Sequence, residues 1–316
     1  MKSKSMRVFT SLVALSVSVG NLPAFADKAA VEQAEKRFND FVKQVGKSNP
    51  QYPVFLANLA DTYIRNGMQS EADDTFKKAV ESQKTKDTPT NSKLPAMYAA
   101  YATTLLSLST ETSFPEKTRK NFREHAEKLL QEGQPYADKC AADSIEKLNY
   151  GLRAIQGYRM AGMKPEEVSR TAAYDKELKV LEDNDKLGRD GILTVAMMLL
   201  RMGQMYAPSP AFRAARMMGE MKIIPDNSPT KPGTVKQKDY KAAETYHLRA
   251  MAQYNRLPDG DPTRIDAQRN LAFWFQLYGQ KQQADYQTKQ LSKLLHTTER
   301  DKLFPPAPPC PACGMG

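Results

Sequence analysis

Residues 56–79, LANLADTYIRNGMQSEADDTFKKA, carry the pattern that decides the fold. Apolar and small residues recur at intervals of three and four on both sides of Asn66-Gly67. This spacing predicts two amphipathic helices, and the Asn-Gly pair predicts a tight turn between them. Small residues let the two helices approach closely, and larger residues fill the space around their contact. We therefore expect a helical hairpin.

The hairpin resembles one unit of the tetratricopeptide repeat (TPR), a motif of 34 residues. Counted from Pro53, it matches positions 4, 7, 8, 11, 15, 20, 24 and 27 with Leu56, Leu59, Ala60, Tyr63, Gly67, Ala72, Phe76 and Ala79. It departs at position 32, where Lys84 replaces the family's proline. A second unit starts at Ile265 and matches five positions with Leu271, Ala272, Phe275, Gly279 and Ala284. The stretch DYKAAETYHLRAM before it resembles the second helix of such a unit, and a weaker match starts at Pro95.

Helical spacing continues along nearly the whole chain, without an alternating strand pattern. We expect an all-α fold, an α-solenoid of antiparallel helical hairpins with about 12 helices, covering residues 27–300. The middle, 142–222, keeps paired helices but loses the TPR pattern, so an irregular helical domain stays open as an alternative. The predicted helices are 28–46, 53–66 paired with 69–83, 94–109 paired with 115–132, 142–161 paired with 165–182, 189–206 paired with 209–222, 237–255, 262–278 and 281–297.

Residues 1–26 have the three regions of a cleaved secretory signal. Lys2, Lys4 and Arg7 precede the short apolar stretch 8–19, and Ala24-Phe25-Ala26 offers small residues for cleavage before Asp27. We therefore expect an exported protein, periplasmic or secreted. No later stretch is long and apolar enough to span a membrane, so we expect no integral membrane segment after cleavage.

The chain has a formal net charge of +10. Residues 1–26 contain three of the positive charges and no acidic residue, which leaves +7 for the remainder. An exported chain rarely meets nucleic acid, so we expect no nucleic-acid partner. The excess charge is typical of a solvated helical surface, and it is also compatible with acidic partners.

Residues 301–316 contain five prolines and are predicted to form a disordered tail. Within it, Cys310 and Cys313 form a CPAC motif, which is half of a tetrahedral metal site. A simple disulfide, a redox pair or no site at all are the alternatives. Cys140, the third cysteine, is expected to be buried rather than reactive.

No pattern indicates catalysis. There is no Ser-His-Asp order, no glycine-rich phosphate loop and no HExxH motif, so we expect that the protein is not an enzyme and needs no cofactor. Seven methionines lie between Met197 and Met221, and their helical spacing favours core packing over copper binding. His247 stands at a repeat packing position, which favours burial.

The TPR resemblance implies that first helices of the hairpins line a concave face that binds an extended peptide. The residues at those positions, by resemblance, include Asp61, Ile64, Arg65, Arg269, Phe273 and Gln276. Ala57 and Asp61 replace the Lys and Asn of the family's carboxylate clamp, so that mode of recognition is not expected. We expect an exported scaffold that binds a protein or peptide partner. The alternative is a metal-binding or redox accessory protein that uses CPAC, and the oligomeric state is not indicated.

Overall fold

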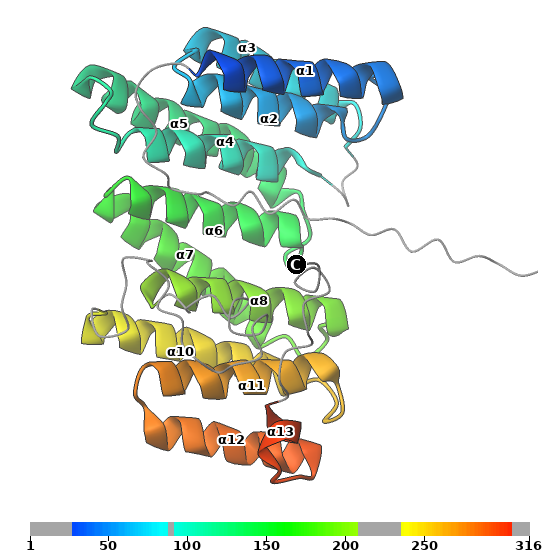
Figure 1. The fold of residues 1–316 in the computed structure, drawn as a ribbon, viewed down its shortest axis with the longest axis vertical. Helices are drawn as coiled ribbons and strands as arrows, with labels where there is room; N and C mark the ends of the chain where they lie inside the picture. Colours follow the sequence, from blue (N-terminus) through cyan, green and yellow to red (C-terminus); the bar gives the residue numbers. More distant parts are fainter. Residues whose placement is uncertain (1–26, 88–91, 208–234, 305–316) are drawn as a thin grey trace, which may run out of the picture.

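The computed structural model describes residues 27–87, 92–207 and 235–304, and every regular element in these ranges is a helix. Successive helices pack as neighbours into an elongated stack, with α1 and α12 near opposite ends (Figure 1). The all-α prediction is confirmed for the described residues. The helices are α1 (Lys28–Val45), α2 (Tyr52–Arg65), α3 (Gln69–Lys84), α4 (Leu94–Leu108), α5 (Glu116–Asp138), α6 (Ile145–Met160), α7 (Lys164–Glu182), α8 (Arg189–Tyr206), α10 (Gln237–Tyr254), α11 (Pro262–Leu277), α12 (Lys281–Leu295) and α13 (Arg300–Leu303).

Four predicted hairpins are present: α2 with α3, α4 with α5, α6 with α7, and α11 with α12. The helical partner of α8 differs from the prediction, which paired 189–206 with 209–222. Helix α8 packs along α10, although residues 208–234 separate the two in sequence. The helix predicted at 209–222 lies outside the described residues.

A glycine turn closes three of these hairpins. After α2, Gly67 has a φ of 76°, a conformation that favours glycine. The Gly67 amide donates to the carbonyl of Ile64, and the Met68 amide donates to the carbonyl of Tyr63, which together form a Schellman motif. The same pair of bonds follows α6 and α11 at Gly162 and Gly279.

The buried apolar residues form two clusters that meet at α6. The first cluster spans α2 to α6, and α4 is buried on nearly all sides because α2, α5 and α6 surround it. The second runs from α6 to α12. Helix α6 contributes Tyr150 and Ala154 to the first cluster, and Leu148, Leu152 and Ile155 to the second. It therefore joins the two halves of the stack.

The largest differences from the predicted boundaries lie at the end of α5 and at the start of the predicted tail. Helix α5 continues to Asp138, beyond the predicted end at 132, with Pro135 inside the helix. Its last turns remain helical because their small residues, including Ala137, are buried against neighbouring helices. In the predicted disordered tail, α13 forms one helical turn, and Leu303 is buried. The rest of that tail, 305–316, lies outside the described residues.

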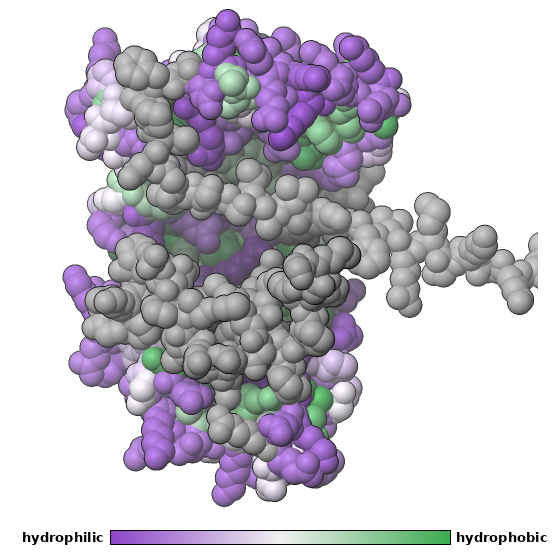
Figure 2. Space-filling model, in the orientation of Figure 1, coloured by the Kyte–Doolittle hydropathy of each residue, from purple (hydrophilic) through white to green (hydrophobic). Residues whose placement is uncertain are grey.

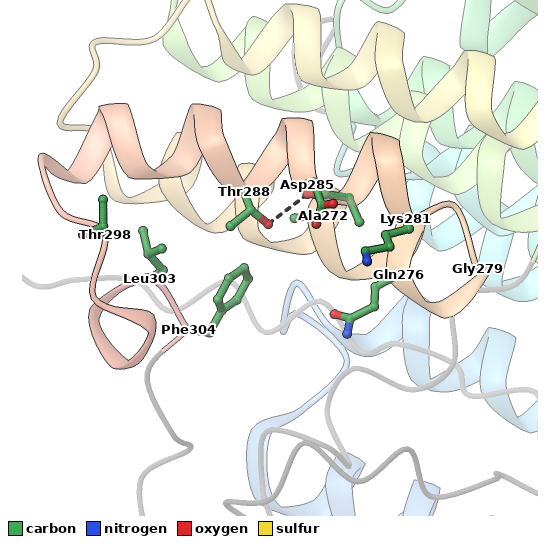
Figure 3. Close-up of a pocket in the computed structure, with 10 residues that line it drawn as sticks. Ala272, Gln276, Gly279, Lys281, Asp285, Thr288, Thr298, Leu303 and Phe304 are labelled. Atoms are coloured by element: carbon green, nitrogen blue, oxygen red, sulfur yellow. Dashed lines mark hydrogen bonds between the residues drawn. The ribbon is translucent and has the colours of Figure 1, made fainter.

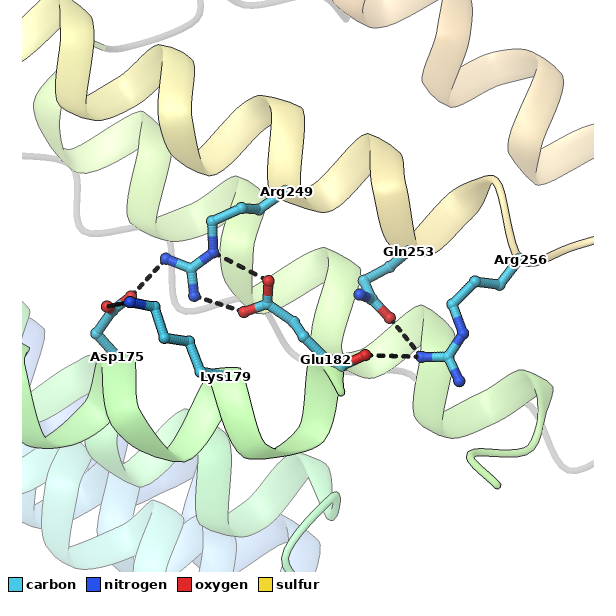
Figure 4. Close-up of polar contacts among 6 residues, drawn as sticks. All are labelled: Asp175, Lys179, Glu182, Arg249, Gln253 and Arg256. Carbon is cyan, nitrogen blue, oxygen red and sulfur yellow. Dashed lines mark hydrogen bonds and ion pairs between the residues drawn. The ribbon is translucent and has the colours of Figure 1, made fainter. Parts of the chain in front are cut away.

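An arginine joins two second helices of neighbouring hairpins (Figure 4). Arg249 of α10 contacts Asp175 at 2.6 Å and Glu182 at 2.5 Å, both on α7. Burial alone would lower the pKa of Arg249, but its hydrogen bonds to the two carboxylates raise that pKa above its ordinary value. We interpret this ion-pair group as a structural link between α7 and α10, because the Arg249 guanidinium already donates hydrogen bonds to Asp175 and Glu182.

No helix among the described residues is long and apolar enough to cross a membrane.

Candidate functional site

The first helices of successive hairpins contact one another directly: α2 with α4, α4 with α6, and α6 with α8. Polar side chains connect them, and we define the first-helix face by Asp61, Arg65, Thr103, Thr104, Asn149, Arg153 and Arg201. In the space-filling view, a recess at mid-height in the stack shows both hydrophilic and hydrophobic residues (Figure 2). The first-helix face itself extends from α2 to α8 and carries both charged and neutral polar side chains.

At the α2 end of this face, Asp61 and Arg65 form an ion pair with Nε and Oδ2 separated by 2.7 Å. The Thr104 hydroxyl of α4 donates to Asp61 Oδ1 at 2.5 Å and lies 3.4 Å from Arg65 Nη2. The Arg65 and Asp61 side chains are 27% and 21% exposed, so each still reaches solvent. The pair is neutral as a unit, and it fixes α2 against α4.

Two arginines occupy the middle of the face. Arg201 of α8 donates to the side-chain oxygen of Asn149 at 2.7 Å, and the Thr103 hydroxyl donates to the backbone carbonyl of Arg153 at 3.3 Å. Burial lowers the pKa of Arg153, and the positive charge of Arg201 lowers it further. Within the described residues, neither guanidinium forms an ion pair with a carboxylate. Among the described residues, this part of the face therefore carries positive charge that no carboxylate pairs with.

The prediction that Ile64 contacts a partner is wrong. Its side chain is fully buried, at 0% exposure, in the cluster that packs α2 against its neighbours. Ile64 stands one helical turn after Ala60, which is also fully buried, so both point inward. Asp61 and Arg65 are the predicted residues of α2 that remain accessible.

The three predicted residues on α11 lie near the other end of the stack (Figure 1). Arg269 donates to the carbonyls of Leu303 at 2.6 Å and Lys302 at 3.2 Å, so it holds α13 in place. Gln276 is exposed and borders a pocket of about 560 Å³ between α11, α12 and residues 298–304 (Figure 3). Phe273 is half-buried. The six predicted residues therefore form two separate groups rather than one site.

The sequence contained a signal for Arg201 that the repeat comparison missed. Ile192, Val195, Ala196 and Leu199 of α8 have the spacing of Leu56, Leu59, Ala60 and Tyr63, and all four are buried. Arg201 follows Ile192 by nine residues, as Arg65 follows Leu56. No comparable signal identified Arg153.

The metal and redox alternative concerns Cys310 and Cys313, which lie outside the described residues. Among the residues that the structure describes, no group of three or more His, Cys, Asp or Glu side chains could hold a metal ion. Cys140 is half-buried rather than buried, and burial raises the pKa of its thiol, which disfavours the reactive thiolate. Met198 and Met202 are fully buried in the core, as their spacing predicts.

Comparisons with protein-family models, with curated proteins and with solved structures found no match to this chain.

Proposed function

We propose that this chain is an exported scaffold that binds an acidic, extended segment of a protein or peptide partner on its first-helix face. In this proposal the helices form a TPR-like solenoid, and the protein acts by binding rather than by catalysis. Export rests on the sequence features of residues 1–26, which lie outside the described residues.

The observation that carries the proposal is the pair Arg153 and Arg201 on adjacent first helices. Neither is paired with a carboxylate of the described residues, while Arg249 and Arg65 both are. A partly buried guanidinium without a counterion is electrostatically costly, and a carboxylate supplied by a partner would offset that cost. The charge on the face thus favours an acidic partner.

Hydrogen-bonding groups adjacent to the arginines support an extended partner. Thr103 and Asn149 are partly exposed and carry a hydroxyl and an amide group on two successive first helices. A peptide that crossed these helices could exchange backbone hydrogen bonds with them while its carboxylates met the arginines. Electrostatic attraction would contribute much of the binding, so the affinity should decrease as the salt concentration increases.

The test is the affinity of the full chain for a labelled oligoglutamate peptide, measured by fluorescence anisotropy, with an oligoglutamine peptide of equal length for comparison. We expect saturable binding of oligoglutamate only. Replacing both arginines, Arg153→Gln with Arg201→Gln, should weaken it about tenfold or more, because two charge-assisted hydrogen-bond sites are lost.

The matched control removes two charges elsewhere. Lys78→Gln with Lys117→Gln changes exposed residues on α3 and α5, which are second helices. This variant should bind oligoglutamate within about twofold of the unchanged chain, since only general attraction is altered. Equal losses in the two double variants would show that net charge, and not this face, attracts the peptide.

A further inference from the structure

A groove of about 450 Å³ lies between α10 and α12, and α11 contributes to its floor. Its lining includes Leu248 and Asn255 from α10, Gln268 from α11, and Tyr286 and Gln290 from α12. Apolar cavities of about 150 Å³ in proteins can hold a benzene molecule, so this groove has room for about two six-membered rings that carry polar substituents. It shares no residue with the first-helix face.

Two buried glutamines on the floor of the groove keep unused hydrogen-bonding atoms. Gln268 is 3% exposed and Gln287 is 7% exposed. Gln268 Nε2 donates to the backbone carbonyl of Gln287 at 3.0 Å and to Gln287 Oε1 at 2.6 Å. Gln268 Oε1 and Gln287 Nε2 form no hydrogen bond within the described residues, and both atoms keep accessible surface. Buried amides are nearly always hydrogen-bonded, so these two atoms indicate partners supplied from the groove.

Further polar groups converge on the groove at its rim. Asn255 is exposed and Gln290 is partly exposed, so both amides can reach a ligand. Arg264 Nη1 pairs with Asp259 Oδ1 at 2.5 Å, and Lys293 is exposed to solvent. The charges of these lining residues nearly balance. The groove therefore offers several neutral donors and acceptors and little net charge.

An exposed aromatic ring lies at the edge of the groove. Tyr286 is 59% exposed, and it is the only aromatic residue among the exposed large apolar side chains of the described residues. Leu248, which lines the groove from α10, is 42% exposed. The face of an aromatic ring carries partial negative charge, so it attracts the slightly positive C–H groups of a ring that lies on it. The groove thus combines an apolar edge with a floor of amides.

We infer that this groove binds a short oligosaccharide. A sugar ring has an apolar C–H face, which would lie on Tyr286, and hydroxyl groups that would donate to and accept from the amides. These hydroxyls point outward in several directions, and the amides of three helices converge from several directions. An extended peptide backbone presents its groups along one line, so it matches this arrangement less well. The inference does not rest on the proposed acidic partner, since it concerns other residues and another ligand chemistry.

The test is a titration of the full chain, followed in ¹H–¹⁵N spectra, with maltose, cellobiose and N,N′-diacetylchitobiose. We expect at least one of these disaccharides to shift signals of α10 and α12 saturably, including the side-chain amides of Asn255 and Gln287. Oligoglutamine is titrated in parallel, because its amides offer similar hydrogen bonds without a sugar ring. It should cause no saturable shift of these signals.

Substitutions at the exposed ring test whether a sugar lies on it. Tyr286→Ser removes the ring and should weaken disaccharide binding about tenfold, whereas Tyr286→Phe keeps the ring and should bind within about twofold of the unchanged chain. Val168→Ser is the matched control, because Val168 of α7 is 66% exposed and lies outside the groove. It should leave the affinity unchanged.

A second pair of variants tests the amide floor. Gln287→Met keeps a side chain of similar length but removes both amide atoms, so disaccharide binding should weaken about tenfold. Gln83→Met is the matched control, because Gln83 is also 3% exposed but lies on α3, outside the groove. It should leave the affinity unchanged. Circular dichroism verifies that both chains keep their helices.

Three results would overturn the inference. The first is the absence of a saturable shift with all three disaccharides. The second is undiminished disaccharide binding by the Tyr286→Ser chain, whose substitution is at an exposed position and should not prevent folding. The third is binding of oligoglutamine as tight as that of the disaccharides, which would assign the groove to a peptide.

Discussion

Gly151 permits a close contact between α6 and α7. A Cβ at this position would lie 2.6 Å from Cδ2 and 2.8 Å from Cε2 of Tyr174. The Tyr174 ring is only 1% exposed, so surrounding residues prevent it from moving aside. The glycine is therefore required by packing, although glycine is a poor helix former.

We predict that Gly151→Ala lowers the free energy of unfolding by up to about 2 kcal/mol. Alanine gains about 1 kcal/mol in helix propensity, but overpacking in a core costs about 1–3 kcal/mol, so the steric cost should prevail. Urea denaturation of the two chains measures the difference. Gly260→Ala, where a Cβ meets nothing within 4 Å, is the control and should change stability by less than about 0.5 kcal/mol. A Gly151→Ala chain as stable as the parent would refute the packing argument.

The buried His247 makes stability depend on pH. Its pKa is lowered from 6.5 to about 4 in the folded chain, so the unfolded chain binds more protons between these values. The stabilising contribution is complete above about pH 6.5 and is lost as the pH falls toward 4. The expected loss is about 3 kcal/mol, measured by urea denaturation across this range. His247→Phe should flatten that dependence, and an identical pH profile in both chains would contradict the assignment.

At the scale of the helical elements, the middle hairpin shows why a position-by-position comparison with the TPR pattern finds no match there. Tyr174 follows Gly162 by twelve residues, as the small Ala79 follows Gly67. Gly151 on the first helix accommodates the large Tyr174 on the second helix. In the first hairpin the position that matches Gly151 holds the large Leu56, so the large and small residues have exchanged positions between the two helices. A comparison made position by position cannot detect this exchange, because it depends on a contact between two helices.

Most helix boundaries were predictable because glycine turns and helical spacing are local signals. The pairing of α8 with α10 was not predictable in this way, since 208–234 separate the two helices in sequence. The same limit applied to the candidate site. Asp61 and Arg65 could be placed from their repeat positions, whereas the burial of Ile64 and the attachment of Arg269 to α13 depend on contacts between elements.

The ion-pair group of Arg249 should contribute more to stability than an exposed pair. The Arg249, Asp175 and Glu182 side chains are 18%, 25% and 13% exposed, so removing the arginine leaves two partly buried carboxylates unpaired. We predict that Arg249→Met lowers the free energy of unfolding by about 2–4 kcal/mol. Lys120→Gln breaks the exposed pair with Glu124 and should cost less than about 0.5 kcal/mol. Urea denaturation measures both variants. Similar losses of unfolding free energy would show that the Arg249 ion pairs stabilise the fold no more than an exposed pair does.

At the scale of the whole molecule, helices contact mainly their neighbours in the stack, and two apolar clusters meet at α6. Stability in such a stack is a sum of local units and their interfaces. A cavity in one cluster should therefore loosen that half first, while the other half keeps its own contacts.

We predict that Leu199→Ala accelerates amide hydrogen exchange in α8 and α10, and leaves α2 and α3 close to their original rates. Leu105→Ala should accelerate exchange in α4 and its neighbours, and leave α8 and α10 close to their original rates. Both leucines are fully buried, so each substitution should cost about 2–5 kcal/mol. Uniform acceleration along the whole chain in either variant would indicate one cooperative unit instead.

The central claim is that the first-helix face binds an acidic segment through Arg153 and Arg201. The most direct test is hydrogen exchange of the full chain with and without saturating oligoglutamate. The proposal predicts protection concentrated in α4, α6 and α8, and loss of that protection in the chain with Arg153→Gln and Arg201→Gln. Protection confined to the second helices α3, α5 and α7, or no protection at a saturating peptide concentration, would contradict it.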